Sequence, residues 1–224
     1  MSAVLEPPAT REPAQVAQAV AEIRAGRMAV LFDEAADEGV LVLAAGMATK
    51  RTVAAMIRHT SGLLRAAMPA ADLDRLAIPP MVARHDEPGQ SRFAVAVDAA
   101  TGITTGISAG DRALVFRILA DPTSVPGDLI RPGHVIPERV AFGGVLERPC
   151  RAEGAVELTR WAGVGPVAVI GELTDDVGTV LGWAGSVAFA HEHQVPIVTI
   201  ADLVSDQSGS GPGVSPLSPT YAPK

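Results

Sequence analysis

The chain has 224 residues, of which 48% are hydrophobic, and its mean hydropathy of +0.27 predicts a large buried core rather than global disorder. Its net charge is −7 and its basic residues form no dense cluster, which excludes a groove for nucleic acid. The single cysteine excludes an internal disulfide, and no apolar run approaches the ~18 residues that span a bilayer. With no stretch of signal-peptide type, these features predict a cytoplasmic protein that does not contact a membrane.

The two ends of the chain differ in composition from its middle. Residues 1–13 are rich in Pro, Ala and Glu and are expected to form a flexible arm. Residues 205–224 read SDQSGSGPGVSPLSPTYAPK, a Ser/Gly/Pro composition that cannot bury enough surface to become ordered. We therefore expect one folded domain over residues 14–204, followed by a disordered tail.

The first third of this domain predicts helices and strands in alternation. Apolar residues recur at helical spacing over residues 16–23, and Gly26 is a natural helix stop. Short apolar runs at residues 28–32 and 40–45 predict two buried strands, with an acidic loop between them. Thr49 can cap the helix that follows.

The remainder of the domain continues this mixture. Alternating apolar residues predict a strand over residues 92–98 with one buried face, and Ser108 with Asp111 forms a capping box that opens a helix ending at Leu119. Residues 121–144 are rich in Pro and Gly and carry few helical signals. The last expected elements are a helix at 152–161, a strand at 167–171, a helix at 187–193 and a strand at 197–200. Because no regular βαβ period, phosphate loop or dinucleotide fingerprint is present, an α+β sandwich is favoured over a Rossmann fold.

Several motifs in one order and spacing give the chain a specific resemblance. They are IRHTSG at 57–62, TTGISAGDR at 104–112, RPGHVIP at 131–137, GGVL at 143–146, GELTDDVGT at 171–179 and the closing FAHEHQVPIVTIADLV. With these motifs the chain resembles the 3,4-dihydroxy-2-butanone 4-phosphate synthases of riboflavin biosynthesis, over nearly the whole domain. The resemblance implies an α+β sandwich with a mixed sheet and a homodimer whose active sites lie near the subunit interface.

The resemblance also implies a chemistry. The family converts ribulose 5-phosphate into formate and a four-carbon phosphorylated hydroxyketone, a reaction that begins with proton abstraction next to a carbonyl. In the family a divalent ion, usually magnesium, polarises the oxygens of the enediol, and carboxylates and a histidine hold the ion and move the protons.

The chain departs from the family in its acidic loop. The family pattern DRENEGD is matched by AADEGV at residues 35–40, which is one residue shorter and has Val40 in place of the last aspartate. Asp37 and Glu38 remain as candidate catalytic carboxylates. The alternative interpretation is a solvated acidic turn between two strands.

A second departure follows GGVL, where the family reads RGGHTE and the chain reads RPCRAE at residues 148–153. Arg151 takes the place of the family's metal-binding histidine, and a guanidinium has no lone pair with which to bind magnesium. Pro149 removes a backbone N–H that could hold phosphate. We therefore assign no metal ligand and expect no cofactor, with Arg151 as a fixed cation that could hold a carboxylate or enolate. Magnesium is expected if the chain is a working family member.

Two further catalytic candidates come from the matched motifs. His134 lies in RPGHVIP, where prolines stiffen the loop, although a lone histidine is more often structural. Glu172 follows an apolar strand and matches the family's catalytic glutamate, so it is suited to proton transfer.

The candidate substrate-binding residues share polar side chains in or beside the matched motifs. They are His59, Thr105, Ser108, Asp111, Arg131, Arg148, Arg151 and Glu153. Capping alone can also explain His59 and Asp111. Cys150 is not expected to be a nucleophile, because nothing supplies a base at a known spacing.

Three functions remain open from the sequence. The first is a repurposed enzyme, a metal-independent lyase, isomerase or cyclase acting on a small enolisable carbonyl compound in specialised metabolism. The second is a magnesium-dependent 3,4-dihydroxy-2-butanone 4-phosphate synthase. The third is a catalytically dead homologue that serves as a binding partner. The substitutions on both sides of one metal site favour the first.

Overall fold

One mixed sheet organises the computed structural model, which describes residues 13–83 and 91–208. In these residues its seven strands lie in the order β4-β5-β3-β6-β2-β1-β7. The strands are β1 (Ala29–Asp33), β2 (Glu38–Ala44), β3 (Arg65–Pro69), β4 (Val97–Ala99), β5 (Leu129–Val140), β6 (Ala168–Glu172) and β7 (Ile197–Thr199). The pairs β1–β7 and β3–β5 are parallel and the other four are antiparallel. This confirms the α+β fold with a mixed sheet.

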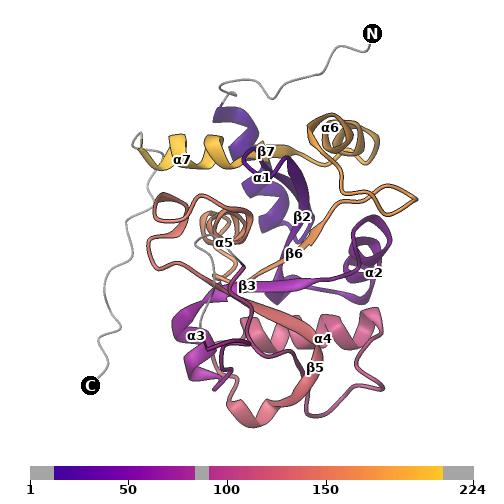
Figure 1. Cartoon of the computed structure of the whole chain (residues 1–224), viewed down its shortest axis with the longest axis vertical. Helices are drawn as coiled ribbons and strands as arrows, with labels where there is room; N and C mark the ends of the chain where they lie inside the picture. The colour runs from indigo at the N-terminus through magenta and orange to yellow at the C-terminus, as the bar shows by residue number, and fades with distance from the viewer. Residues whose placement is uncertain (1–12, 84–90, 209–224) are drawn as a thin grey trace.

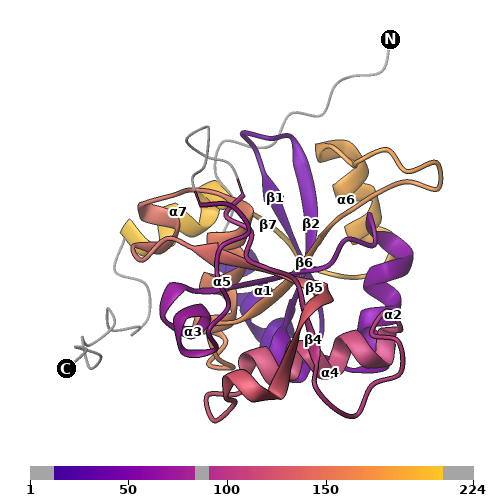
Figure 2. The same cartoon turned by 60° about the horizontal axis from the view of Figure 1, so that its bottom comes forward.

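Helices cover both faces of the sheet (Figures 1 and 2). On one face lie α1 (Pro13–Arg24), α5 (Arg151–Trp161) and α7 (Ile200–Ser208). On the other lie α2 (Lys50–His59), α3 (Ala70–Arg75), α4 (Ala109–Ala120) and α6 (Trp183–Glu192). Short 3-10 helices occupy Ala45–Met47, Pro126–Asp128 and Gly144–Leu146.

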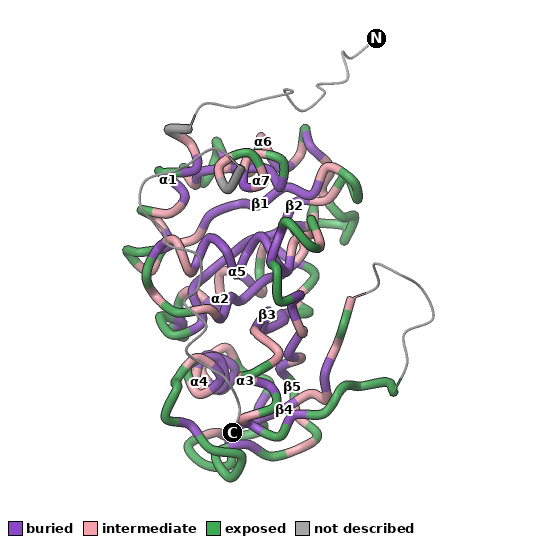
Figure 3. Tube along the Cα trace, turned by 90° about the vertical axis from the view of Figure 1, so that its left-hand side faces the viewer, coloured by how far each residue is buried: buried purple, intermediate pink, exposed green. Residues whose placement is uncertain are grey.

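Strand alternation divides the interior into two cores, one on each face of the sheet. Along β2, Leu41 and Leu43 join the core beneath α2 and α4, whereas Val40 and Val42 join the core beneath α1 and α5. All four side chains are fully buried, and Figure 3 shows the burial of β1 and β2 along their length. The face beneath α5 also carries the charged residues of the candidate site.

Capping residues set the starts of two helices as expected. Thr49 and Thr52 each accept the other's backbone N–H at the start of α2. Ser108 accepts the N–H of Asp111 at the start of α4. The Asp111 carboxylate, however, accepts the Thr104 hydroxyl instead of completing the expected capping box.

The prediction of a strand over residues 92–98 is largely wrong. β4 covers Val97–Ala99, and the preceding residues make isolated bridges at Phe93 and Ala94. The Pro/Gly-rich passage instead forms β5, the longest strand of the described residues. Gly133 makes this possible, because a Cβ there would lie 2.0 Å from the carbonyl carbon of Val97.

β3 and α3 were also not expected. β3 reads RAAMP, and alanine has a low intrinsic preference for strands, so pairing with β5 and β6 decides its conformation. Most other expected helices and strands are present, with ends shifted by up to four residues.

The expected arm and tail fall largely outside the described residues. α1 begins at Pro13, the last residue of the expected arm. α7 was not expected, and it extends to Ser208, beyond the expected domain boundary at residue 204 and into the predicted tail. Residues 1–12 and 209–224 are not described. In the parts of the chain that are described, no helix has the length and apolar character needed to cross a membrane.

Candidate active site

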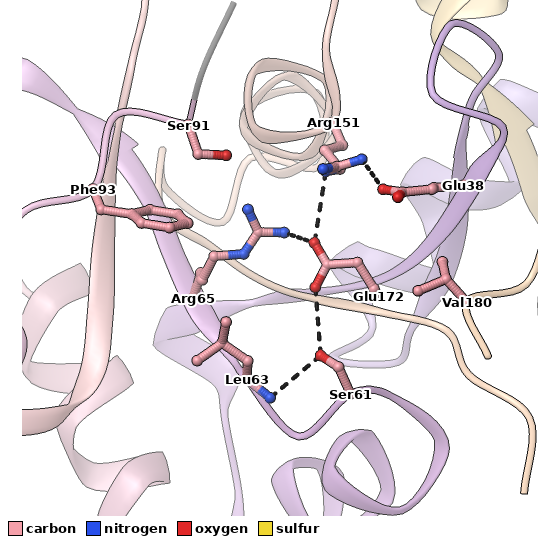
Figure 4. A pocket seen from close by; sticks show the side chains of 9 residues that line it. All are labelled: Glu38, Ser61, Leu63, Arg65, Ser91, Phe93, Arg151, Glu172 and Val180. Atoms are coloured by element: carbon pink, nitrogen blue, oxygen red, sulfur yellow. Dashed lines mark hydrogen bonds and ion pairs between the residues drawn. The ribbon is translucent and has the colours of Figure 1, made fainter. Parts of the chain in front are cut away.

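A pocket of about 300 Å³ opens at one end of the central strands (Figure 4). It is lined by Glu38, Ser61, Leu63, Arg65, Ser91, Phe93, Arg151, Glu172 and Val180. Three of these residues, Glu38, Arg151 and Glu172, are sequence-predicted site residues.

The strand directions explain why these charged residues meet. β6 is antiparallel to both β2 and β3, so its carboxyl end, Glu172, lies beside the amino ends of the other two. Glu38 begins β2 and Arg65 begins β3. Glu172 pairs with Val40, and alternation places Glu38, Arg65 and Glu172 on the sheet face beneath α5, whose first residue is Arg151.

Two guanidinium groups share one carboxylate in the pocket. Arg65 donates to Oε1 of Glu172, and Nε of Arg151 lies 3.6 Å from the same oxygen. Arg151 also donates to Oε2 of Glu38 through Nη1. The second oxygen of Glu172, Oε2, lies 3.5 Å from the Ser61 hydroxyl, which donates to it. Oε1 is therefore held by cations, whereas Oε2 faces a neutral hydroxyl.

Arg65 connects the pocket to the interior of the protein through an ion pair. Its Nη1 donates to Glu138 at 2.7 Å, and both side chains are 2% exposed. The Phe93 ring lies over its guanidinium, 5.7 Å from the ring centroid. The Arg65 guanidinium is therefore fixed between strands β5 and β6, and it fixes Glu172 in turn.

His134 lies outside this pocket, in a pair with Asp98. Its Nδ1 is 2.7 Å from Oδ2 of Asp98, and its backbone N–H donates to Oδ1 at 3.0 Å. Any side chain at Gly106 would overlap this pair, because a Cβ there would lie 2.2 Å from Asp98. Asp98 therefore holds the imidazole of His134 in one orientation, and the His134 side chain is 41% exposed.

Sheet register places His134 at the same end of β3 as Glu172, but on the opposite side of that strand. His134 comes two residues before Ile136 and Glu172 two residues after Ile170, and both isoleucines pair with Arg65. Two strand spacings separate the two positions, which is about 10 Å. A single copy of the chain therefore does not bring the two predicted proton carriers into contact.

The loop before α4 is held by Asp111. Its carboxylate accepts the Thr104 hydroxyl at 2.7 Å and the Gly106 N–H at 3.1 Å, and the Thr104 hydrogen bond lowers the pKa of Asp111. Thr105 is exposed in this loop and Ser108 caps the helix. These contacts explain the loop's shape, and the substrate-binding roles of Thr105, Ser108 and Asp111 remain predictions.

Arg148 and Glu153 lie together in the interior. Nε of Arg148 donates to the fully buried Glu153 at 2.7 Å, and the Ala141 N–H donates to the same carboxylate at 2.8 Å. Neither side chain lines the pocket, and their contacts hold the segment between β5 and α5. Their roles in substrate binding remain predictions.

Three other predicted residues have local structural partners. Asp37 has a positive φ of 52° and accepts the N–H of Trp183 at the start of α6. Arg131 donates to the Leu76 carbonyl at 2.7 Å. The ring of His59, at the end of α2, packs against Phe189 and His193, and burial lowers its pKa. None of the three lines the pocket, and their functional roles stay predictions.

Sequence reasoning missed the partners of the predicted residues. Arg65 had a visible signal, because it is the sole charged residue in the apolar run LLRAAMPAA at 63–71. Asp98 had a weaker signal at the end of an alternating segment. Ser61 lies in the matched motif IRHTSG but was not singled out, because its partner Glu172 is 111 residues away along the chain. Glu138 gave no signal, because its partner Arg65 is 73 residues away.

Magnesium is the ion that the family resemblance implies for this site. Magnesium binds one or two carboxylates and keeps several waters. The pocket offers Glu38 and Glu172, but the Arg151 guanidinium lies on both of them. Within the described residues, no group of three or more His, Cys, Asp or Glu is placed to hold a metal. In this arrangement the residues do not fit a divalent ion.

Comparison with known proteins gives a consistent result. The family model for 3,4-dihydroxy-2-butanone 4-phosphate synthase matches residues 17–206. The riboflavin biosynthesis protein RibBA of Salinispora tropica is 48% identical over 191 residues, which cover 84% of this chain and 48% of that protein. RibBA of Mycobacterium tuberculosis is 45% identical over 193 residues, covering 84% of this chain and 45% of its own length. The chain therefore spans about half the length of these curated relatives.

Solved structures show the same relationship. A crystal structure of 3,4-dihydroxy-2-butanone 4-phosphate synthase in complex with two magnesium ions is 35% identical, with a TM-score of 0.82 over 87% of this chain and 97% of that one. RibBX of A. baumannii, a two-domain 3,4-dihydroxy-2-butanone 4-phosphate synthase, is 35% identical, with a TM-score of 0.83 over 91% of this chain and 60% of that one.

These comparisons contradict the first functional expectation, that of a repurposed enzyme in specialised metabolism. Relatives 45–48% identical over most of the chain carry the riboflavin biosynthesis name, and the matching structures are synthases. The expectation gave too much weight to a few substitutions around one metal site. The expected absence of a cofactor is likewise unsupported, since one matching synthase binds magnesium. With its motifs, fold and relatives in agreement, the chain belongs to the 3,4-dihydroxy-2-butanone 4-phosphate synthase family.

Proposed function

We propose that the chain converts ribulose 5-phosphate into formate and 3,4-dihydroxy-2-butanone 4-phosphate. The observation that carries this proposal is the agreement with riboflavin biosynthesis proteins, at 48% identity over 191 residues. The pocket supports it, because it combines a carboxylate suited to proton transfer with cations suited to an oxyanion. The same reaction makes the protein a lyase that acts on a small phosphorylated sugar.

Glu172 is the proposed proton carrier at the carbon next to the carbonyl. Its Oε1 is held by Arg65 and lies 3.6 Å from Nε of Arg151, which fixes the direction of the carboxylate. Its Oε2 accepts a long 3.5 Å hydrogen bond from Ser61, and a substrate C–H or O–H can displace so weak a donor. Proton transfer by a positioned carboxylate is the step that the family's reaction requires first.

Arg151 is the proposed substrate-binding cation of the pocket. Its side chain is 23% exposed, so it is open to the pocket while it is held by Glu38. A fixed guanidinium stabilises the negative charge that develops on oxygen when an enediolate forms, because its donors are already oriented.

His134 is the proposed second proton carrier. When Nδ1 donates its proton to Asp98, Nε2 is the ring nitrogen that remains to exchange protons with a ligand, and the His134 side chain is 41% exposed. Because His134 lies across β3 from Glu172, we propose that the protein is a homodimer with sites near the interface, as its family resemblance implies. The exposed apolar residues Phe142 and Leu146, 91% and 58% exposed, support a contact surface on this segment.

We also propose that the protein acts in the cytoplasm, as its sequence predicts. The remaining predicted residues, Thr105, Ser108, Asp111, Arg131, Arg148, Glu153, His59 and Asp37, are proposed to shape or support the site.

The proposal is tested with the full chain and ribulose 5-phosphate. Formate is measured by coupling to NAD reduction with formate dehydrogenase, in one series with magnesium and in another with EDTA. We expect formate to appear in equimolar amounts with the four-carbon phosphate, and Glu172→Gln to lower its production by about 100-fold or more. The absence of formate in both series would overturn the proposed function.

A further inference from the structure

The arrangement of Arg151 distinguishes this pocket from a metal site. Glu38 and Glu172 come from different strands, β2 and β6, and one guanidinium contacts both of them. The contact uses two different nitrogens, Nη1 for Glu38 and Nε for Glu172. In Figure 4 dashed lines join the side chain of Arg151 to both carboxylates. Arg151 therefore joins the two carboxylates in the way that a bound cation would.

The charges around the pocket are nearly balanced without an added ion. Arg65 and Arg151 contribute two positive charges, and Glu38, Glu138 and Glu172 contribute three negative ones. A divalent cation on Glu38 and Glu172 would stand beside two guanidinium groups that cannot lose their protons. Repulsion between cations at such short range strongly opposes its binding.

The position of Arg151 is set by the rest of the fold. It is the first residue of α5, and the next residue, Ala152, is fully buried in the core beneath that helix. The helix start cannot shift without disturbing this core. The Arg151 guanidinium can therefore move away from Glu38 and Glu172 only if its side chain rotates, and it then loses both contacts.

We propose that Arg151 is a built-in cation that holds Glu38 to Glu172 and excludes a divalent metal ion from these two carboxylates. The inference rests on the proposed function in taking this pocket as the active site. It goes beyond that function because it assigns to the Arg151 side chain the position that a metal ion would otherwise take. Its test measures metal binding and does not depend on catalytic turnover.

The test is a manganese titration of the full chain, with free Mn²⁺ followed by electron paramagnetic resonance. The variants are Arg151→His, which supplies a ligand, and Arg151→Gln, which removes the charge at similar length. Arg160→Gln is the matched control, because Arg160 lies on the same helix and is 20% exposed, close to the 23% of Arg151. Circular dichroism confirms that each variant is folded.

We expect Arg151→His or Arg151→Gln to gain one Mn²⁺ site that binds at least about 10-fold more tightly than any site of the parent chain, since one unit of positive charge is removed at contact distance. Adding Glu38→Gln to either Arg151 variant should remove the gained site. The Arg160→Gln control should bind Mn²⁺ as the parent does. The inference is overturned if the parent chain binds one Mn²⁺ as tightly as both variants, or if neither variant gains a site.

The formate assay separates this inference from the proposed function. If the parent makes no formate but the Arg151 variants gain the manganese site, the proposed function fails and the inference stands. If the parent makes formate and binds Mn²⁺ as tightly as the variants, the inference fails and the function stands.

Discussion

Arg65 and Glu138 form an ion pair at 2.7 Å between the neighbouring parallel strands β3 and β5, and both side chains are 98% buried. A buried pair of this kind contributes little net stability, because two charges lose their hydration. Removing one partner is different, since it leaves the other charge buried without compensation. We therefore expect Arg65→Met to lower the free energy of unfolding by about 3–5 kcal/mol, measured by urea denaturation at pH 7.

The control for this prediction is the exposed pair of Arg139 and Asp74. These side chains are 28% and 67% exposed, so Arg139→Met should cost less than about 1 kcal/mol. Combining Arg65→Met with Glu138→Gln should recover part of the lost stability, because the uncompensated charge is gone. Equal losses in Arg65→Met and Arg139→Met would contradict this view of the pair.

Glu172→Gln tests the proposed proton carrier. The substitution keeps the size of the side chain but removes the base, so we expect formate production to fall by about 100-fold to 10,000-fold. Binding of ribulose 5-phosphate, measured by calorimetry, should change much less. Glu192→Gln, an exposed change on α6, is the control and should retain full activity. A Glu172→Gln chain within a few-fold of the parent rate would show that another group moves the proton.

Asp98 is expected to act through His134 rather than on the substrate. Its two oxygens hold Nδ1 and the backbone N–H of His134, so Asp98→Asn frees the ring to rotate and to change tautomer. We expect His134→Gln to lower kcat by about 100-fold or more, and Asp98→Asn to lower kcat less, with KM nearly unchanged in both. A change in KM alone would assign the pair to substrate binding.

The sequence predicted much of the fold because its signals are local. Apolar spacing gave α1, and Thr49 and Ser108 marked the starts of α2 and α4. β5 was missed because prolines and Gly133 weaken every local strand signal. Its pairing with β4 and β3, far away in the chain, forms it nevertheless.

The candidate site was predictable as a set of residues but not as an arrangement. Motifs identified Glu172, Arg151 and His134, yet nothing local shows that Arg151 contacts Glu38, 113 residues away. Nor does the sequence show that β3 lies between His134 and Glu172. Sheet order decides which of these side chains meet, and the order β5-β3-β6-β2 is a property of the whole chain.

We expect the thiol of Cys150 to react slowly. Burial, together with the nearby Glu153 carboxylate, raises its pKa from 9.0 to about 11. At pH 8 the folded chain should therefore carry ~100-fold less thiolate than a free cysteine, and only the thiolate reacts. Labelling with iodoacetamide should be slower by about that factor in the folded chain than in urea. Comparable rates in the two states would contradict the raised pKa.

The lowered pKa of His59 predicts that the protein loses stability as the pH falls. Burial is the main cause of its lowered pKa, and the nearby positive charges of His193 and Arg58 lower it further, while Glu192 and Asp176 oppose the shift. A histidine with a lowered pKa binds its proton more readily in the unfolded chain. The unfolded state therefore gains protons first as the pH falls below about 6.5, and stability decreases.

The measurement is urea denaturation of the parent and of His59→Gln at pH 7, 6 and 5. The parent should lose more stability than His59→Gln between pH 7 and pH 5, because the variant has no proton to gain at this position. His191→Gln is the control, since His191 is exposed on α6 and should leave the pH dependence of the parent unchanged. If His59→Gln follows the parent at all three pH values, the acid-side loss comes from other groups and the packing of His59 against Phe189 and His193 does not disfavour its charged form.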